Sequence, residues 1–232
     1  GFYRDGSHAG YLVLPVAGVA LKPRSLSFVQ AASLGVPYTT AWDALQRSGV
    51  GADTCLLVIG ANGAVGSAAI ALAKVLGARV LAAVRGPEQA RTLREQGIEV
   101  IVLGKPEDLA AQVNAVFSGG AEVIFDTTGH WLPATVGALR VFGRVAFIAA
   151  PLDGHVHLPA LALYRKGGTL IGVNSLLYSC GECARMLDQF GQYFDQGLLP
   201  VPHQLQEARL ADGLGSYAEV NAGTCAKVVL IP

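Results

Sequence analysis

Residues 56–86, LLVIGANGAVGSAAIALAKVLGARVLAAVRG, join an apolar run to an apolar helical pattern through a turn that contains glycine. A strand, a tight turn and a helix in this order are typical of a site where the amides at a helix start hold a diphosphate. Gly63 can allow close approach of the backbone, and Gly66 can allow tight packing of helix on strand. Ala61 replaces the first glycine of the strict G-x-G-x-x-G motif, so the match is to a variant. We expect a dinucleotide cradle here; the alternative is a glycine-rich turn that binds none.

The end of the next strand bears on which dinucleotide binds. An NAD site usually places a carboxylate there to accept a hydrogen bond from the ribose 2′-hydroxyl. Here Val84 occupies that place and Arg85 follows it. A guanidinium suits a 2′-phosphate, so the pattern favours NADP(H). The alternative is that Arg85 is a solvated charge at a strand end.

Short apolar runs alternate with helical patterns over most of the chain. The expected strands are 56–60, 79–84, 99–102, 122–125, 144–149 and 169–173. The expected helices are 65–76, 87–96, 106–117, 132–141 and 180–196. Strands separated by helices indicate parallel βαβ units with right-handed crossovers. The sequence therefore predicts an α/β fold with a doubly wound, six-stranded parallel Rossmann sheet.

The two ends of the chain depart from this alternation. Residues 11–23, YLVLPVAGVALKP, resemble a strand, residues 28–46 a helix, and the closing CAKVVLIP another strand. The chain starts at Gly1 and Met186 is its single methionine, so we expect either a processed product or a piece of a longer protein.

Composition narrows the class of ligand. Seventeen basic and seventeen acidic residues give zero formal charge, so the net charge does not favour binding to nucleic acid or to an anionic membrane. No apolar run is long enough to span a bilayer, and no signal peptide opens the chain. Four cysteines in 232 residues do not make a secreted disulfide framework. We expect a cytoplasmic protein with a small-molecule substrate.

Several blocks, in the same order and spacing, resemble a known family. They are GSHAGYLVLP, LSFVQAASLGVPYTTAWDAL, VIGANGAVGSAAIALAKVLGARV, VIFDTTG, FGRVAFIA and AKVVLIP. These blocks are similar to the zinc-independent quinone oxidoreductases (zeta-crystallin-like) of the medium-chain dehydrogenase/reductase superfamily. The resemblance covers essentially all 232 residues. It implies that residues 1–47 and 200–232 are remnants of a GroES-like catalytic domain, with a linking helix, around a Rossmann domain at 48–199.

The resemblance also implies the site residues. Thr40 would lie beside the nicotinamide, as the catalytic residue of the site. The cofactor would contact Asn62, Gly63, Ala64 and Val65 at the pyrophosphate, Arg85 at the adenosine end, Thr128, Gly129, Ala149 and Ala150 along its length, and Val173 and Asn174 near the carboxamide. The alternatives are a helix-capping role for Thr40 and a turn role for Asn174.

Departures from the family pattern bear on the metal, on the choice of dinucleotide and on turnover. Zinc-dependent relatives have a cysteine ligand where this chain has Val36 followed by Pro37, so we expect no catalytic metal. Leu103 stands where some members have a tyrosine near the 2′-phosphate, which weakens the case for NADP. Ala226 replaces a common glycine in the last block. Most of the GroES-like domain is missing, so this chain alone can bind cofactor yet turn over poorly.

Other candidate sites are weaker. Cys180 and Cys183 form a CxxC at a helix start, but a structural zinc site needs two more ligands. His155 and His157 share a face of an extended segment without a third ligand nearby. Asp126, in IFDTTG, is expected to organise its turn rather than to act as an acid.

The resemblance implies NADPH-dependent hydride transfer to a quinone or another electron-poor enone or carbonyl. Alternatives are enoyl-thioester reduction, zinc-dependent alcohol oxidation, and a non-catalytic NADP(H)-binding module. Members commonly pair through the edge strand, here 169–173, so we expect a homodimer, which sedimentation analysis can test.

Overall fold

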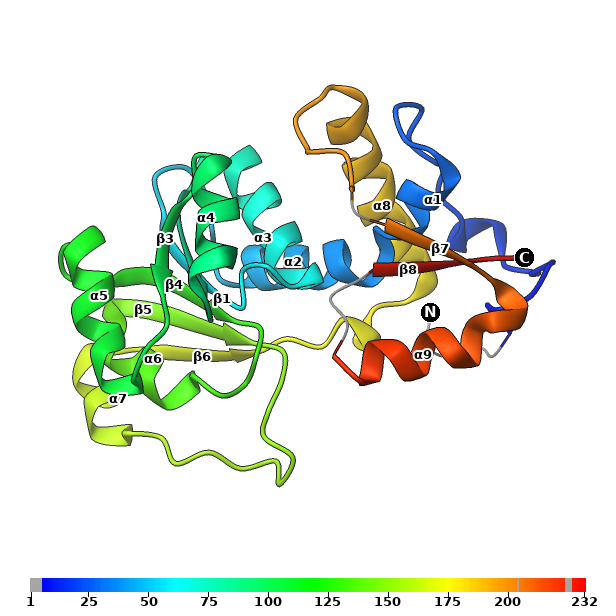
Figure 1. Ribbon diagram of the computed structural model, residues 1–232. Coiled ribbons are helices and arrows are strands. Elements are labelled where there is room, and N and C mark those ends of the chain that lie inside the picture. Colours follow the sequence, from blue (N-terminus) through cyan, green and yellow to red (C-terminus); the bar gives the residue numbers. More distant parts are fainter. Residues whose placement is uncertain (1–5, 204, 224–226) are drawn as a thin grey trace. The chain divides into compact units, whose positions relative to one another are not determined.

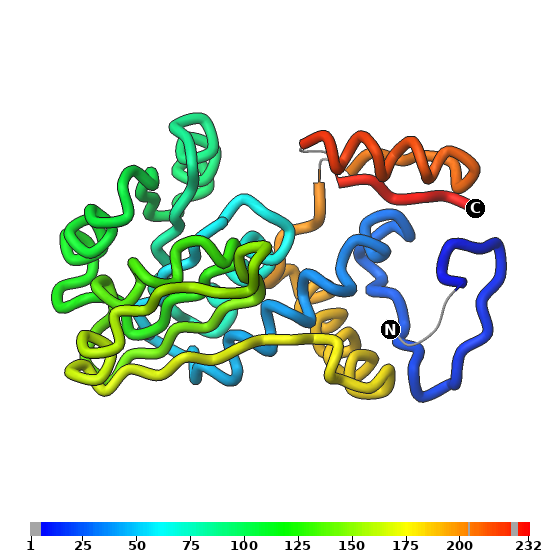
Figure 2. Tube along the Cα trace, turned by 90° about the horizontal axis from the view of Figure 1, so that it is seen from below, coloured from blue at the N-terminus to red at the C-terminus, as the bar shows by residue number. Residues whose placement is uncertain are grey.

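The computed structural model describes residues 6–203, 205–223 and 227–232. The described chain divides into two compact units. Residues 40–174 form one, called the sheet unit below; the residues up to Thr39 and those from Ser175 onward form the other, called the flanking unit. The chain passes between the units within helix α2 (Gly35–Arg47) and again after Asn174 (Figure 2). The domain boundaries expected at 47/48 and 199/200 stay a prediction.

A six-stranded parallel sheet forms the centre of the sheet unit, which confirms the predicted fold class (Figure 1). Its strand order is β3-β2-β1-β4-β5-β6, in which the direction of winding reverses between β1 and β4. The strands are β1 (Cys55–Ile59), β2 (Arg79–Val84), β3 (Glu99–Val102), β4 (Ala121–Asp126), β5 (Leu139–Phe147) and β6 (Thr169–Gly172). Ligands of such sheets bind at the carboxyl ends of the strands, beside this reversal.

Helices cover both faces of the sheet (Figure 1). One face is covered by α3 (Ala64–Val75) and α4 (Pro87–Glu95), the other by α5 (Leu109–Val116), α6 (Leu132–Ala138) and α7 (Ala160–Lys166). A 3₁₀ turn, η2 (Pro106–Asp108), precedes α5. The central strands are therefore apolar at successive positions: residues 56–59 of β1 and 80–84 of β2 are all buried. Helix α7 was not predicted.

Strand β5 differs from the prediction at its start. The sequence predicted a helix to residue 141 and a strand from 144, but α6 ends at Ala138 and β5 begins at Leu139. Leu139 pairs with Ala121, and the next pair is Arg144 with Val123, so residues 140–143 of β5 bulge out of the register. Phe142 has a φ of +60°, which is rare for an aromatic residue. The secondary-structure propensities of residues 140–143 do not predict a bulge of this length.

The flanking unit contains a two-stranded parallel sheet and several helices. Its elements are η1 (Val16–Gly18), α1 (Phe28–Ala32), the start of α2, η3 (Ser175–Leu177), α8 (Cys180–Asp195), β7 (Leu205–Arg209), η4 (Leu210–Asp212), α9 (Gly213–Asn221) and β8 (Lys227–Ile231). The strand expected at 11–23 is wrong, since this segment contains the 3₁₀ turn η1 and otherwise no regular element. The single helix expected at 28–46 is two helices, α1 and α2. The closing strand is confirmed as β8, although residues 225 and 226 lie outside the described part.

Side-chain caps set the starts of α1 and α8. The hydroxyls of Ser27 and Ser179 each accept a hydrogen bond from the amide three residues on, and the side chains of Gln30 and Glu182 accept one from the cap amide. These capping boxes satisfy amides that would otherwise lack a partner. The Ser179 hydroxyl and amide both donate to the Glu182 carboxylate, and these two bonds hold the pKa of that carboxyl below its usual value.

Strand β6 is an edge strand, since in the described sheet it pairs with β5 alone. The homodimer expected through this edge stays a prediction. Arg47 near the end of α2 donates from Nη1 to the Gly172 carbonyl at 2.7 Å, which ties α2 to the end of β6.

Tyr38 lies in the apolar core of the flanking unit. Its ring centroid is 5.8 Å from that of Phe190 and 5.5 Å from that of Phe194, both on α8. Burial raises the pKa of the Tyr38 hydroxyl to about 12.

This pKa predicts a loss of stability at alkaline pH. The folded pKa lies above the unfolded value of about 10, so the contribution of Tyr38 is complete below pH 10 and falls as pH rises toward 12. Between pH 9 and pH 11.5 the native protein should lose about 2 kcal/mol more unfolding free energy than Tyr38→Phe. Urea unfolding at both pH values measures this difference, and an equal loss in the two proteins would contradict it.

Candidate functional site: a nucleotide cradle at the carboxyl edge of the sheet

The glycine turn between β1 and α3 is fixed by backbone contacts. Gly60 has a φ of +78°, and a Cβ there would lie 2.3 Å from Thr127 Oγ1. The Gly63 amide donates to the Gly60 carbonyl at 3.0 Å. A Cβ on Gly66 would lie 2.3 Å from that carbonyl oxygen and 2.9 Å from Ala61 Cα. Gly66 therefore allows the close packing of helix on strand that the sequence predicted.

The start of α3 presents amides without a side-chain cap. Its N-cap is Gly63, and no side-chain hydrogen bond caps it. Asn62, Gly63 and Ala64 are exposed, and Val65 is half-buried. First-turn amides of a helix have no intrahelical partner and carry the positive end of the helix dipole. This turn therefore fits a diphosphate, which is what the sequence predicted for residues 62–65.

The turn after β4 is organised by Asp126, as the sequence predicted. Its fully buried carboxylate accepts four hydrogen bonds. Oδ1 accepts from the amide and hydroxyl of Thr128, both at 2.8 Å, and from the Gly129 amide at 3.2 Å, while Oδ2 accepts from the Trp131 amide at 3.1 Å. These four bonds tie residues 128–131 to the end of β4, so Asp126 organises the turn.

Gly129 brings the ends of β4 and β5 together. Its φ is +73°, and a Cβ there would lie 2.4 Å from the carbonyl carbon of Ala149 and 2.7 Å from the Ala150 amide nitrogen. These three residues, with Leu132 and Phe147 among others, line a hollow of about 250 Å³. Three of the predicted cofactor residues thus share one hollow at the carboxyl edge of the sheet.

The remaining predicted residues lie as follows. Val173 is buried and its amide donates to the Phe147 carbonyl at 2.9 Å, which extends the pairing of β6 with β5 by one residue. Asn174 follows it and is exposed. Thr40 is buried inside α2, five residues after the helix start, so it is not the helix cap considered as the alternative.

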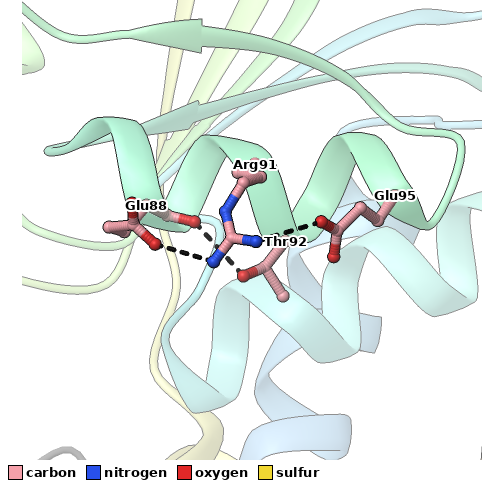
Figure 3. A network of polar contacts seen from close by, with 4 residues as sticks. All are labelled: Glu88, Arg91, Thr92 and Glu95. Carbon is pink, nitrogen blue, oxygen red and sulfur yellow. Dashed lines mark hydrogen bonds and ion pairs between the residues drawn. The ribbon is translucent and has the colours of Figure 1, made fainter.

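Arg85 lies at the end of β2, next to the buried Val84. Its amide donates to Gln89 Oε1 at 3.1 Å, while its exposed guanidinium has no hydrogen-bond or ion-pair partner in the described chain. Glu88 is the nearest acid in sequence, but it pairs with Arg91 at 2.9 Å, and Glu95 pairs with the same arginine at 3.4 Å (Figure 3). The Arg85 guanidinium therefore keeps all its donors for a ligand.

The residues set aside as metal or redox sites stay apart. Within the described ranges, no three His, Cys, Asp or Glu side chains come close enough to hold a metal ion. Cys55, Cys180 and Cys183 are free thiols there, and Cys225 lies outside the described residues. Burial is the main cause that raises the pKa of the Cys183 thiol, so it is less reactive than an ordinary cysteine. In the part of the chain that the structure describes, none of the helices has the length and hydropathy that a membrane crossing requires.

Comparisons with known proteins agree with this geometry. The family profile described as zinc-binding dehydrogenase matches residues 64–191. The chain belongs to this family, within the medium-chain dehydrogenase/reductase superfamily. It is 32% identical, over 99% of its length, to a zinc-type alcohol dehydrogenase-like protein of Schizosaccharomyces pombe, of which it spans 69%.

Two further relatives bear on the reaction. The chain is 30% identical, over 98% of its length, to the chloroplastic NADPH-dependent alkenal/one oxidoreductase of Arabidopsis thaliana, and it spans 53% of that protein. A quinone oxidoreductase structure from Pseudomonas syringae pv. Tomato DC3000 superimposes with a TM-score of 0.80 at 27% identity, covering 94% of this chain and 69% of that one. Other matches are named as NAD-dependent alcohol dehydrogenases. The chain thus belongs to a superfamily of oxidoreductases, whose members bind nicotinamide cofactors.

The family name implies a zinc ion, and the described residues do not fit one. Val36, where zinc-dependent relatives were expected to have a cysteine, is an exposed apolar residue in the first turn of α2. Since the chain spans only part of its relatives, the metal content of the whole protein stays a matter for proposal.

The packing at Gly66 generates a prediction for the cradle. Gly66→Ala should lower the free energy of unfolding by about 3 kcal/mol, because its methyl group meets backbone that cannot move aside. It should also weaken NADPH binding more than tenfold, because α3 must shift away from β1. Gly86→Ala is the matched control: nothing lies within 4 Å of its Cβ, and its cost should be about 0.5 kcal/mol or less. Denaturant unfolding and fluorescence titration measure both, and equal effects of the two variants would contradict this account.

Proposed function

We propose that this chain is part of an NADPH-dependent oxidoreductase that transfers a hydride to a quinone or another electron-poor enone or carbonyl without zinc. The observation that supports it best is the pairing of an uncapped helix start at Gly63 with the unpartnered guanidinium of Arg85. The first fits the diphosphate of a dinucleotide and the second fits a 2′-phosphate. The names of the Arabidopsis and Pseudomonas relatives favour the same class of reaction.

The bound cofactor would supply the hydride, and the residues of this chain would bind and orient it. Amides at the start of α3 would hold the diphosphate. The loop held by Asp126 would fix Thr128 and Gly129 along the cofactor, with Ala149 and Ala150 opposite. Val173 and Asn174 would border the carboxamide end.

Thr40 is the residue that we propose beside the nicotinamide, as a hydroxyl on a rigid helix. Zinc-independence is proposed because Val36 and Pro37 take the place of a ligand, and because a quinone or enone accepts a hydride without a strong Lewis acid. The free thiols at Cys55, Cys180 and Cys183 support a reducing compartment, the cytoplasm.

Cofactor specificity tests the role of Arg85. Arg85→Met should weaken NADPH binding by about ten- to a hundredfold, which is the range for loss of a charge-assisted hydrogen bond, and leave NADH binding within about twofold. Arg91→Met, which removes a nearby arginine that already has partners, is the control and should change neither. Parallel fluorescence titrations give the four ratios. Equal or tighter binding of NADH by the native protein would overturn the assignment to NADP(H).

Turnover tests the reaction class. The chain, and any longer natural form of the protein, should oxidise NADPH at 340 nm with a 1,4-quinone or an alkenone, and chelation of zinc should leave the rate unchanged. Tight NADPH binding without turnover in the longer form would favour the non-catalytic binding module instead. Oxidation with an enoyl thioester alone would favour enoyl reduction, and a rate that needs zinc and an alcohol would favour alcohol dehydrogenation.

A further inference from the structure

A second hollow lies at the opposite edge of the sheet from the nucleotide cradle. Its volume is about 500 Å³, and it is lined by Gly49, Thr54, Glu122, Arg140, Phe142 and Arg144 among others. Thr54 immediately precedes β1, and Glu122 is the second residue of β4. Arg140, Phe142 and Arg144 belong to β5. All of them are in the sheet unit; Thr54, Glu122 and Arg140 are at the amino-terminal ends of strands, and Gly49 lies between α2 and β1. We call this the amino-edge hollow.

The bulge in β5 makes this hollow. Four residues, 140–143, stand between Leu139, which pairs with Ala121, and Arg144, which pairs with Val123. Only Glu122 stands opposite them on β4. The backbone of the bulge is therefore outside the ladder, and Phe142 holds a φ of +60° with 77% of its surface exposed. Bulges and residues in strained conformations are concentrated at functional sites.

The charges in the hollow favour an anion. Two guanidinium groups, of Arg140 and Arg144, face one carboxylate, that of Glu122. Arg140 Nη1 pairs with Glu122 Oε1, and Arg144 Nη1 donates to the Ser48 carbonyl at 2.7 Å. In the described chain each guanidinium uses only this one nitrogen, so the other donors of both forks are available.

The ion pair between Arg140 and Glu122 competes only weakly with an anion for the Arg140 guanidinium. The side chains of Arg140 and Glu122 are 50% and 36% exposed, and an ion pair at that exposure contributes little to stability. Glu122 Oε2 also accepts from the Cys55 amide at 3.3 Å. A dianion can therefore recruit Arg140 without breaking a strong interaction.

A buried polar atom lies next to the hollow. Ser48, whose carbonyl receives Arg144, is completely buried, and its hydroxyl is the one buried side-chain N or O atom without a hydrogen-bond partner among the residues described. Such an atom in a native protein calls for an explanation, and a ligand or ordered water is a common one. Gly49, the next residue, lines the hollow.

We propose that the amino-edge hollow is a binding site for a phosphate monoester, held by Arg140 and Arg144. A phosphate dianion matches two guanidinium forks better than a single carboxylate does. The Thr54 hydroxyl already accepts from the Gly51 amide at 3.1 Å and keeps a proton to donate. The exposed ring of Phe142 offers an apolar surface to the organic group of the ester. This site is independent of the cradle and of the proposed reaction.

Phosphate titrations of single variants test the proposal. The probes are inorganic phosphate and phenyl phosphate, followed by amide NMR shifts at Thr54 and Gly143, with and without saturating NADPH to block the cradle. Arg144→Met should weaken binding at least about tenfold. Glu122→Gln should tighten it about three- to tenfold, because it removes the competing carboxylate and keeps an oxygen for the Cys55 amide. Phenyl phosphate should bind more tightly than phosphate.

Matched variants separate binding from folding. Arg94 also donates to a backbone carbonyl, of Val100 at 3.1 Å, so Arg94→Met should leave phosphate binding unchanged. Arg85→Met should likewise leave the shifts at Thr54 and Gly143 unchanged. If Arg144→Met does not fold, weaker phosphate binding by Arg140→Met and tighter phosphate binding by Glu122→Gln still test the proposal. No saturable shift at these amides up to about 20 mM phosphate, weaker binding in Glu122→Gln, or equal effects of Arg94→Met and Arg144→Met would overturn the proposal.

Discussion

The close approach of α3 to the end of β1 is the constraint on which the nucleotide cradle depends. It exists because Gly66 has no side chain, so the helix can lie against the Gly60 carbonyl. The start of α3 is uncapped by any side chain, and Gly63 and Ala64 there are exposed to solvent. Any side chain larger than hydrogen at residue 66 would move the helix and the amide donors together. Glycine at residue 66 is therefore required both for the packing of α3 on β1 and for the position of the amides that would bind a diphosphate.

Most of the sheet unit could be predicted from the sequence, because its signals are local. Runs such as LLVI in β1 and VLAAV in β2 are apolar at every position, which is typical of strands buried on both faces, and glycine or proline bounds most of the helices. The role of Asp126 was also visible, since DTTG has the spacing of a side chain that binds amides two and three residues on. The position of Gly129 against the backbone of Ala149 was not visible, because it depends on a contact between distant residues.

The rest could not be predicted for identifiable physical reasons. The bulge at 140–143 depends on the register between β4 and β5, and register is a property of two strands together. The segment 11–23 has the composition of a strand but finds no partner strand in the described chain, so it forms only a 3₁₀ turn. Thr40 was assigned by resemblance, and its burial in α2 shows that it does not cap the helix but does not show what it faces.

The four hydrogen bonds to Asp126 also bear on how this fold can change. Asparagine at this position would turn its NH₂ group toward at least one donor, the Trp131 amide, and glutamate would displace both oxygens by a methylene. Each of these two nearest chemical substitutes would therefore lose hydrogen bonds that hold the turn. Evolution or engineering toward new substrates would have to leave the turn after β4 intact. The segment between Pro151 and Leu158, much of which is exposed to solvent, is where the sequence could vary instead.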